Sequence, residues 1–159
     1  MNIQKPLPVS VQLLRNAHEI YGEHGLIPST DMAVGIDLRA CLDSTSQCTI
    51  PPGERKKIPT GLAIEPQEPG IAGFVYSRSG LGAVTGLVVA QGVGIIDPDY
   101  RGEICVFLLN TGTEHYTVEP GERIAQIVFQ PYRQPAFTIT ETLGQTDRGQ
   151  GGFGHTGKK

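Results

Sequence analysis

Hydrophobic and polar residues alternate over short stretches along most of the chain. Residues 116–118 and 138–140 show the two-residue period of a β-strand, and further apolar runs recur roughly every ten residues. This pattern predicts a series of short strands. They cover Val9 to Leu14, Gly35 to Ala40, Gly61 to Ile64, Ile71 to Tyr76, Leu87 to Ala90, Glu103 to Leu109, His115 to Val118, Ile124 to Pro131 and Ala136 to Thr140.

Turn-forming residues separate the expected strands. The segments 51–53, 68–70, 110–112 and 119–121 each combine Gly with Pro or Asn, which are the residues that tight turns prefer. Many short strands divided by such turns are typical of an all-β sandwich or barrel.

Only two segments have weak helical character, residues 16–24 and a turn or two near residues 79–84. No repeat and no linker interrupts the pattern, and 159 residues is the length of one domain. We expect a single β domain over residues 1–144. The composition agrees, because 21 Gly and 12 Pro favour many turns over long helices.

The charge of the chain argues against two classes of partner. A net charge of −3 gives no basic field of the kind that a general nucleic-acid binder needs. The 18 residues between Arg78 and Asp97 carry no charge, but glycines and polar residues interrupt them. That stretch favours a pair of buried strands around a turn over a membrane-spanning helix.

The cysteines and the N-terminus point to a cytoplasmic protein. Cys41, Cys48 and Cys105 are an odd number without metal-type spacing, so neither a disulfide framework nor a zinc site is expected. Free cysteines of this kind usually act as small core residues. The first 11 residues lack the apolar core of a signal peptide.

The last 15 residues differ from the rest of the chain. Residues 145–159 hold five glycines and one large apolar side chain, Phe153, so they cannot form a core alone. A frayed terminus is one interpretation, and an arm that orders over a ligand is the other. Residues 149–154 match a dinucleotide-binding spacing, but the chain ends too soon for the required helix. The glycine backbone and Arg148 still suit phosphate oxygens.

Four further clusters combine polar residues with turns or strands. They are residues 33–40 around Asp37, 77–82 with Arg78 and Ser79, 92–102 with Asp97, and 121–126 with Gln126. Taken singly, each has a simpler explanation: an exposed strand-edge charge, a helix N-cap, a hairpin turn, or a turn before a strand.

In order and spacing, these clusters and the glycine-rich tail are similar to the five motifs of the homotrimeric dUTPase family. The resemblance runs from about residue 9 to residue 157. It implies a distorted jelly-roll subunit in a three-fold trimer, with residues 145–159 as an arm that closes over the active site. It also implies hydrolysis of dUTP to dUMP and pyrophosphate with Mg²⁺.

The resemblance assigns roles to individual residues. Asp37 should hold Mg²⁺ through water, Asp97 should orient and deprotonate the attacking water, and Tyr100 should lie against the deoxyribose. The backbone of residues 92–95 should read the pairing edge of uracil. The substrate-binding residues that the resemblance implies are Arg78, Ser79, Gly80, Gln91, Gly94, Ile95, Ile96, Tyr100, Gln126, Arg148, Phe153, Gly154, His155 and Thr156.

Within the tail, Phe153 should cover the uracil, and Arg148, His155 and Thr156 should close on the phosphates. Two positions depart from a common family pattern. Gln91 stands where many members carry Asn, and His155 stands where many carry Ser.

Two alternative functions remain open from the sequence. One is a dCTP deaminase, or a bifunctional enzyme, on a related trimeric fold, with Glu103 or Glu114 as the base; neither residue has a recognisable deaminase setting. The other is a trimeric β-sandwich protein that is not an enzyme. Such a protein has no need of Asp37, Asp97, Arg148 and Phe153 together.

Overall fold

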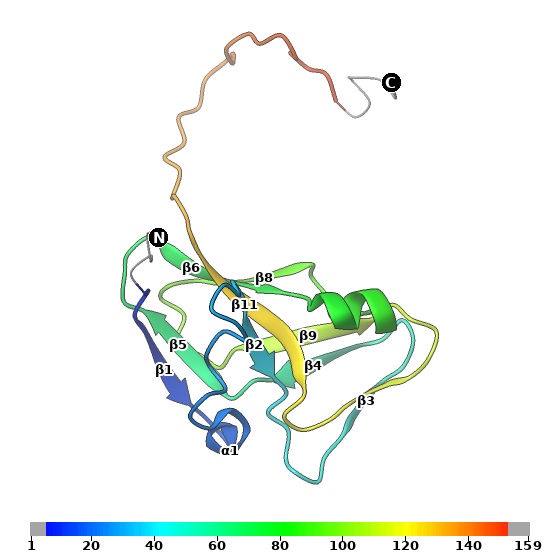
Figure 1. The fold of residues 1–159 in the computed structure, drawn as a ribbon. Coiled ribbons are helices and arrows are strands. Elements are labelled where there is room, and N and C mark those ends of the chain that lie inside the picture. Colours follow the sequence, from blue (N-terminus) through cyan, green and yellow to red (C-terminus); the bar gives the residue numbers. More distant parts are fainter. Residues whose placement is uncertain (1–5, 153–159) are drawn as a thin grey trace.

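The structure, a computed structural model, describes residues 6–152, and it confirms the all-β class (Figure 1). Its elements are β1 (Val9–Leu13), α1 (Ala17–Tyr21), β2 (Ile36–Arg39), β3 (Cys48–Ile50), β4 (Arg55–Pro59), β5 (Leu62–Pro66), β6 (Ile71–Tyr76), the π-helical turn η1 (Leu81–Thr85), β7 (Leu87–Val89), β8 (Val93–Ile96), β9 (Cys105–Asn110), β10 (Tyr116–Val118) and β11 (Arg123–Pro131).

The described strands form small antiparallel sheets around one core. The largest has the order β2-β11-β6-β8, a second has the order β4-β9-β7, and the pairs β1-β5 and β3-β10 complete the fold. Apolar side chains from these sheets meet in a single cluster. Its largest fully buried members include Leu38, Ile50, Ile58, Leu62, Leu87, Ile104, Leu108 and Ile124.

Most of the expected strands form within one or two residues of their predicted ends, and residues 71–76 match as predicted. β7 and β8 are the two strands expected in the uncharged stretch between Arg78 and Asp97. Two strands were not predicted. β3 has only three residues, and β4 carries three exposed basic residues in a row. A strand held by its neighbours needs no strong pattern of its own.

The strand expected at residues 136–140 is absent, so that prediction was wrong for the single chain. Phe137 and Ile139 are 90% and 100% exposed, and no strand lies beside them. Alternation alone does not make a strand, because the backbone groups also need a hydrogen-bonding partner. The last backbone hydrogen bond to the sheets in the described part joins Tyr132 N–H to the Gly70 carbonyl oxygen, at 2.9 Å. Figure 1 shows the chain leaving the body beyond β11.

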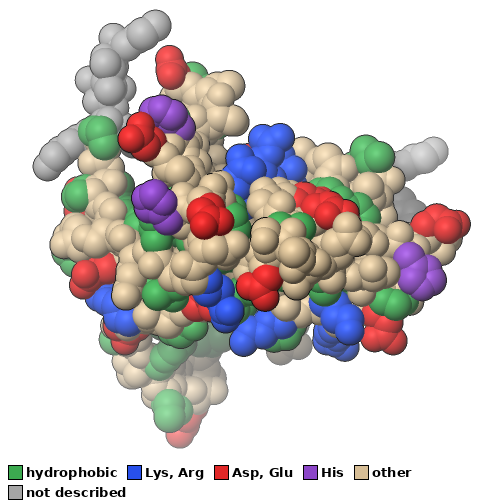
Figure 2. All heavy atoms as spheres, turned by 90° about the horizontal axis from the view of Figure 1, so that it is seen from below, with side chains coloured by type: hydrophobic (Ala, Val, Ile, Leu, Met, Phe, Trp, Pro, Cys, Tyr) green, Lys and Arg blue, Asp and Glu red, His purple; other side chains and the backbone are tan. Residues whose placement is uncertain are grey.

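The surface carries charges of both signs. On the face shown in Figure 2, acidic and basic side chains lie interspersed among apolar and uncharged atoms. This distribution fits the small net charge of −3. None of the helices within residues 6–152 is long and apolar enough to cross a bilayer.

Candidate active site

The first of two cavities that hold predicted site residues, here called the Arg78 cavity, has a volume of about 320 Å³. Five residues predicted from the sequence line it: Asp37, Arg78, Ser79, Gly80 and Gln126. The other lining residues are Ser29, Ala33, Val34, Gly35, Arg123 and Val128.

Strand register brings these residues together. Gln126 on β11 lies opposite Asp37 of β2 on one side and opposite Tyr76 of β6 on the other. The Gln126 amide then donates to the Ser77 carbonyl oxygen at 3.1 Å, which places Arg78 beside the same group. Gly35 permits this arrangement, because a Cβ there would lie only 2.3 Å from Gln126 Oε1. Three predicted motifs therefore converge on one cavity.

The Arg78 cavity holds more positive than negative charge. Arg78 Nε donates to Asp37 Oδ1 at 2.8 Å, and Arg123 Nη1 donates to Asp37 Oδ2 at 3.2 Å. The Asp37 side chain is 22% exposed. Two guanidinium groups on one carboxylate leave a net positive charge, which suits a phosphate chain. Sequence reasoning missed Arg123, although it stands only three residues before Gln126 in the same cluster.

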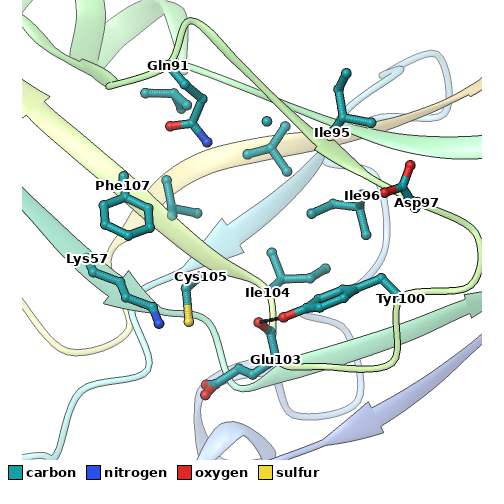
Figure 3. Close-up of a pocket in the computed structure, with 14 residues that line it drawn as sticks. Lys57, Gln91, Ile95, Ile96, Asp97, Tyr100, Glu103, Ile104, Cys105 and Phe107 are labelled. Carbon is teal, nitrogen blue, oxygen red and sulfur yellow. Dashed lines mark hydrogen bonds between the residues drawn. The ribbon is translucent and has the colours of Figure 1, made fainter.

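The second cavity, here called the Tyr100 cavity, has a volume of about 290 Å³ and lies between β8, β9 and β4 (Figure 3). Six predicted residues line it: Gln91, Gly94, Ile95, Ile96, Asp97 and Tyr100. The lining also contains Lys57, Val75, Val89, Glu103, Ile104, Cys105, Val106 and Phe107, none of which was predicted as a site residue.

The Tyr100 ring is held within its own loop. Its backbone N–H donates to the Asp97 carbonyl oxygen at 3.1 Å, and its hydroxyl donates to the Glu103 carbonyl oxygen at 3.0 Å. Gly102 lies under the ring, because a Cβ there would be 2.4 Å from the Tyr100 hydroxyl. The side of the cavity formed by Tyr100 is therefore shaped by a short loop with little room to spare.

Glu103 is not a free base in this cavity. Its carboxylate accepts from Arg15 Nε at 2.8 and 3.0 Å and from the Gly61 N–H at 2.9 Å. Figure 3 shows the Glu103 carboxylate directed away from the Tyr100 ring. Glu114, the other acid considered for deamination, lines neither cavity.

Cys105 does not supply a ready nucleophile to the Tyr100 cavity. Burial raises the pKa of its thiol, and the charge of Glu103 raises it further, while Lys57 opposes this effect. Since the thiolate is the reactive form, this raised pKa makes Cys105 a poorer nucleophile at neutral pH.

Asp97 and Arg78 lie toward opposite ends of the β6–β8 ladder. Ile96, next to Asp97, pairs with Gly73, whereas Val93 pairs with Tyr76, beyond which lies Arg78. Gly73 and Tyr76 are three positions apart along the strand, or about 10 Å. The two cavities share no lining residue. Within one chain, Asp97 and Arg78 therefore do not face a common space.

The described residues hold no cluster of three potential metal ligands. Among the described residues, Asp37 is the only acidic one that lines the Arg78 cavity. Mg²⁺ is commonly bound by one or two carboxylates together with substrate phosphates and water. The donor set therefore fits a metal that arrives with a polyphosphate, rather than one resident in the protein.

The tail adds little to either cavity in the part that is described. Arg148 is exposed and donates to the Gly151 carbonyl oxygen at 2.9 Å, and it lines neither cavity. Phe153, Gly154, His155 and Thr156 lie outside the described residues.

A cationic cavity and an aromatic cavity with a carboxylate, on an all-β scaffold, define a protein suited to nucleoside phosphates. Comparison with known proteins gives the family. The dUTPase family model matches residues 24–157, and the chain belongs to the dUTPase family.

Individual relatives agree with this assignment. A deoxyuridine 5'-triphosphate nucleotidohydrolase from Cronobacter sakazakii is 47% identical over 140 residues, which cover 87% of this chain and 91% of that protein. A mutant dUTPase from Staphylococcus bacteriophage 80alpha, solved with dUpNHpp, has a similar fold, with a TM-score of 0.79 at 24% identity; the match covers 94% of this chain and 98% of that one.

A dUTPase mutant from phage phi11 of S. aureus also shares the fold. Its TM-score is 0.72 at 20% identity, and the match covers 87% of this chain and 99% of that one. That protein coordinates a structural Mg(II) ion.

Proposed function

We propose that the protein hydrolyses dUTP to dUMP and pyrophosphate, which would limit uracil incorporation into DNA and supply dUMP for dTMP synthesis. The observation that carries this proposal is the Tyr100 cavity, where an uncharged strand edge adjoins Asp97. β8 is the outer strand of its sheet in the described chain. Its unpaired N–H and C=O groups can therefore read the donors and acceptors on the pairing edge of uracil.

Each half of the site supplies a different part of the chemistry. In the Tyr100 cavity, Asp97 orients and deprotonates the attacking water, and the Tyr100 ring excludes a ribose 2′-hydroxyl. In the Arg78 cavity, Arg78, Ser79 and Gln126 hold the phosphates. Hydrolysis of a phosphoanhydride depends mainly on such positioning and charge neutralisation.

Mg²⁺, when bound with the triphosphate, would neutralise phosphate charge. Asp37 is the residue that would hold it, through water. Because Asp37 already accepts from two guanidinium groups, binding of phosphate would also draw Arg78 and Arg123 toward the substrate.

The positions of the two cavities support the proposal of a homotrimer with shared sites. A water activated by Asp97 must lie within hydrogen-bonding reach of the phosphate that Arg78 and Gln126 hold. Asp97 and Arg78 are separated along β6 and β8, and this separation supports a site that joins the Tyr100 cavity of one chain to the Arg78 cavity of another.

The chain beyond β11 gives independent support for association. Phe137, Ile139 and Leu143 are 90%, 100% and 88% exposed. Apolar side chains this exposed favour burial against another surface. A neighbouring copy provides that surface in a trimer, and residues 145–159, with Phe153, then close over the completed site.

The structure favours hydrolysis over deamination because Glu103 is occupied by Arg15 and Gly61. A non-enzymatic protein of this fold would have no reason to gather Asp37, Arg78 and Gln126 in one cationic cavity. All three cysteines are free, which supports a reducing, cytoplasmic location.

The proposal is tested by incubating the protein with dUTP and, separately, dCTP in the presence of Mg²⁺. We expect equal amounts of dUMP and pyrophosphate from dUTP and no ammonia from dCTP. Ammonia release from dCTP would instead establish the deaminase function. No product from either nucleotide would contradict an enzymatic role.

A further inference from the structure

We propose that Arg15 is a positioning residue for Tyr100, and that it sets the preference for deoxyribose over ribose substrates by fixing Glu103. This inference rests on the proposed function. Arg15 lies in the turn between β1 and α1, outside every motif that resembles the family, and it is 88 residues from Glu103 in the sequence.

The turn that carries Arg15 is locked onto the start of β5. The Leu14 N–H donates to the Gly61 carbonyl oxygen at 2.7 Å, and the Ala17 N–H donates to the Leu14 carbonyl oxygen at 3.0 Å. Gly61 has a φ of +71°, and a Cβ there would lie 2.7 Å from the Ala17 Cβ. The close approach of these two segments therefore requires glycine at position 61.

Arg15 itself adopts an unusual backbone conformation. It is the only residue other than glycine with a positive φ in the described part of the chain, at 55°. An arginine rarely adopts this region unless other contacts hold it there. The conformation accompanies the contact of Arg15 Nε with both Glu103 carboxylate oxygens.

The Glu103 carboxylate accepts hydrogen bonds from both the turn that carries Arg15 and the segment that carries Gly61. Besides Arg15, it accepts from the Gly61 N–H at 2.9 Å, and the Glu103 side chain is only 16% exposed. The next residue is also fixed, because the Ile104 N–H donates to the Leu62 carbonyl oxygen at 2.7 Å. The Glu103 side chain and the backbone that follows it are thus both held.

The fixed Glu103 carbonyl oxygen is the acceptor for the Tyr100 hydroxyl, at 3.0 Å (Figure 3). Tyr100 is 45% exposed, so few packing contacts restrain the ring from its open side. The position of the ring against a bound sugar therefore depends on this acceptor, and through it on the contacts of the Glu103 side chain with Arg15 and Gly61.

The test compares kcat/KM for dUTP with kcat/KM for UTP. We expect Arg15→Ala to reduce the dUTP-to-UTP ratio by about threefold to tenfold, chiefly through faster UTP hydrolysis. A change of this size is typical when one contact that is coupled to another is lost. Arg15→Lys should keep most of the ratio, because a single donor nitrogen makes the contact to Glu103.

Two further variants control for general damage. Glu65→Gln breaks the exposed Arg101–Glu65 ion pair beside the same loop without touching Glu103, and it should leave the ratio unchanged. Glu103→Gln keeps an acceptor for the Gly61 N–H but loses the charge that pairs with Arg15. Glu103→Gln should also lower the dUTP-to-UTP ratio, and it tests the same contact if Arg15→Ala does not fold.

A double-mutant cycle separates positioning from stability. In a Tyr100→Phe background, which lacks the hydroxyl, Arg15→Ala should produce no further change in the ratio. A full additional drop there, or an unchanged ratio in Arg15→Ala whatever its Tm, would overturn the inference. Failure of the proposed function would appear separately, as absence of pyrophosphate release by the unmodified protein.

Discussion

The Arg78 cavity is assembled by neighbouring strands, whereas the side of the Tyr100 cavity formed by Tyr100 is shaped by a loop that distant segments hold in place. In the first, Asp37 and Gln126 face each other across β2 and β11, so the sheet ladder itself sets their separation. In the second, Tyr100 depends on Glu103, and Glu103 depends on Arg15 and Gly61. The comparison suggests that strand register fixes the charge-binding half, while tertiary contacts tune the half that selects the substrate.

The largest effect should come from the carboxylate of the Tyr100 cavity. Asp97→Asn keeps the shape of the side chain but cannot accept a proton, so kcat should fall by about 10²–10⁴ with little change in dUTP affinity. Steady-state kinetics with pyrophosphate detection measure this. Asp99→Asn, on the same loop but outside the cavity lining, is the matched control. More than half of normal turnover in Asp97→Asn would remove Asp97 from the mechanism.

A smaller loss is expected from the carboxylate of the Arg78 cavity. Asp37→Asn removes the shared partner of Arg78 and Arg123, so kcat/KM should fall by about 10–100-fold. The Mg²⁺ concentration that gives half-maximal activity should rise. A Mg²⁺ titration of activity checks both effects. Asp43→Asn, exposed and outside both cavity linings, should behave as the parent. An unchanged Mg²⁺ requirement in Asp37→Asn would exclude the metal role.

A steric change should disturb selectivity without removing any catalytic group. A Cβ at Gly102 would lie 2.4 Å from the Tyr100 hydroxyl, so Gly102→Ala must displace the ring. Because the ring can move toward solvent, we expect a modest loss of stability and a dUTP-to-UTP ratio reduced by about tenfold. Competition between the two nucleotides gives the ratio directly. An unaltered ratio would show that the ring does not meet the sugar.

The last effect falls on stability rather than activity, and it concerns a tertiary contact on the strand that carries Asp37. The Tyr21 hydroxyl accepts from the Arg39 N–H at 2.9 Å, and burial raises the pKa of Tyr21 from 10.0 to about 12. As the pH rises, the Tyr21 hydroxyl therefore loses its proton at a lower pH in the unfolded chain than in the folded one. The stabilisation is therefore complete below pH 10 and is lost as the pH rises through 12.

Denaturant unfolding of the parent and of Tyr21→Phe at several pH values tests this contribution. Between pH 9 and pH 12, the free energy of unfolding of the parent should fall relative to the variant by about 2 kcal/mol. Parallel pH profiles for the two proteins would mean that Tyr21 titrates alike in the folded and unfolded states.

Short apolar runs divided by turn residues allowed the all-β class and most strands to be predicted from the sequence, and the order of the motifs allowed the family to be predicted. Asp37, Arg78 and Gln126 line one cavity, while their place in a substrate site and their individual roles stay predictions. What the sequence could not show was pairing at a distance. Nothing local in the chain indicates that Arg15 meets Glu103.

Strand predictions failed for related reasons. β4 was missed because its exposed side chains are basic, although its backbone pairs with β9 along its whole length. Residues 136–140 have the right alternation but no partner within the described chain. A period of two reports which face of a segment is apolar, and only the rest of the assembly determines whether a partner strand exists.

The central claim is that one active site joins the Tyr100 cavity of one chain to the Arg78 cavity of another. The direct test mixes two inactive variants, Asp97→Asn and Arg78→Ala, by refolding them together, with a sizing column to confirm exchange. If chains share sites in a trimer, each mixed trimer has one intact site of three. Random equal mixing makes about three-quarters of trimers mixed, so pyrophosphate release should recover to roughly a quarter of the parent's rate. A mixture that exchanges chains but stays inactive would show that both cavities of a site belong to the same chain.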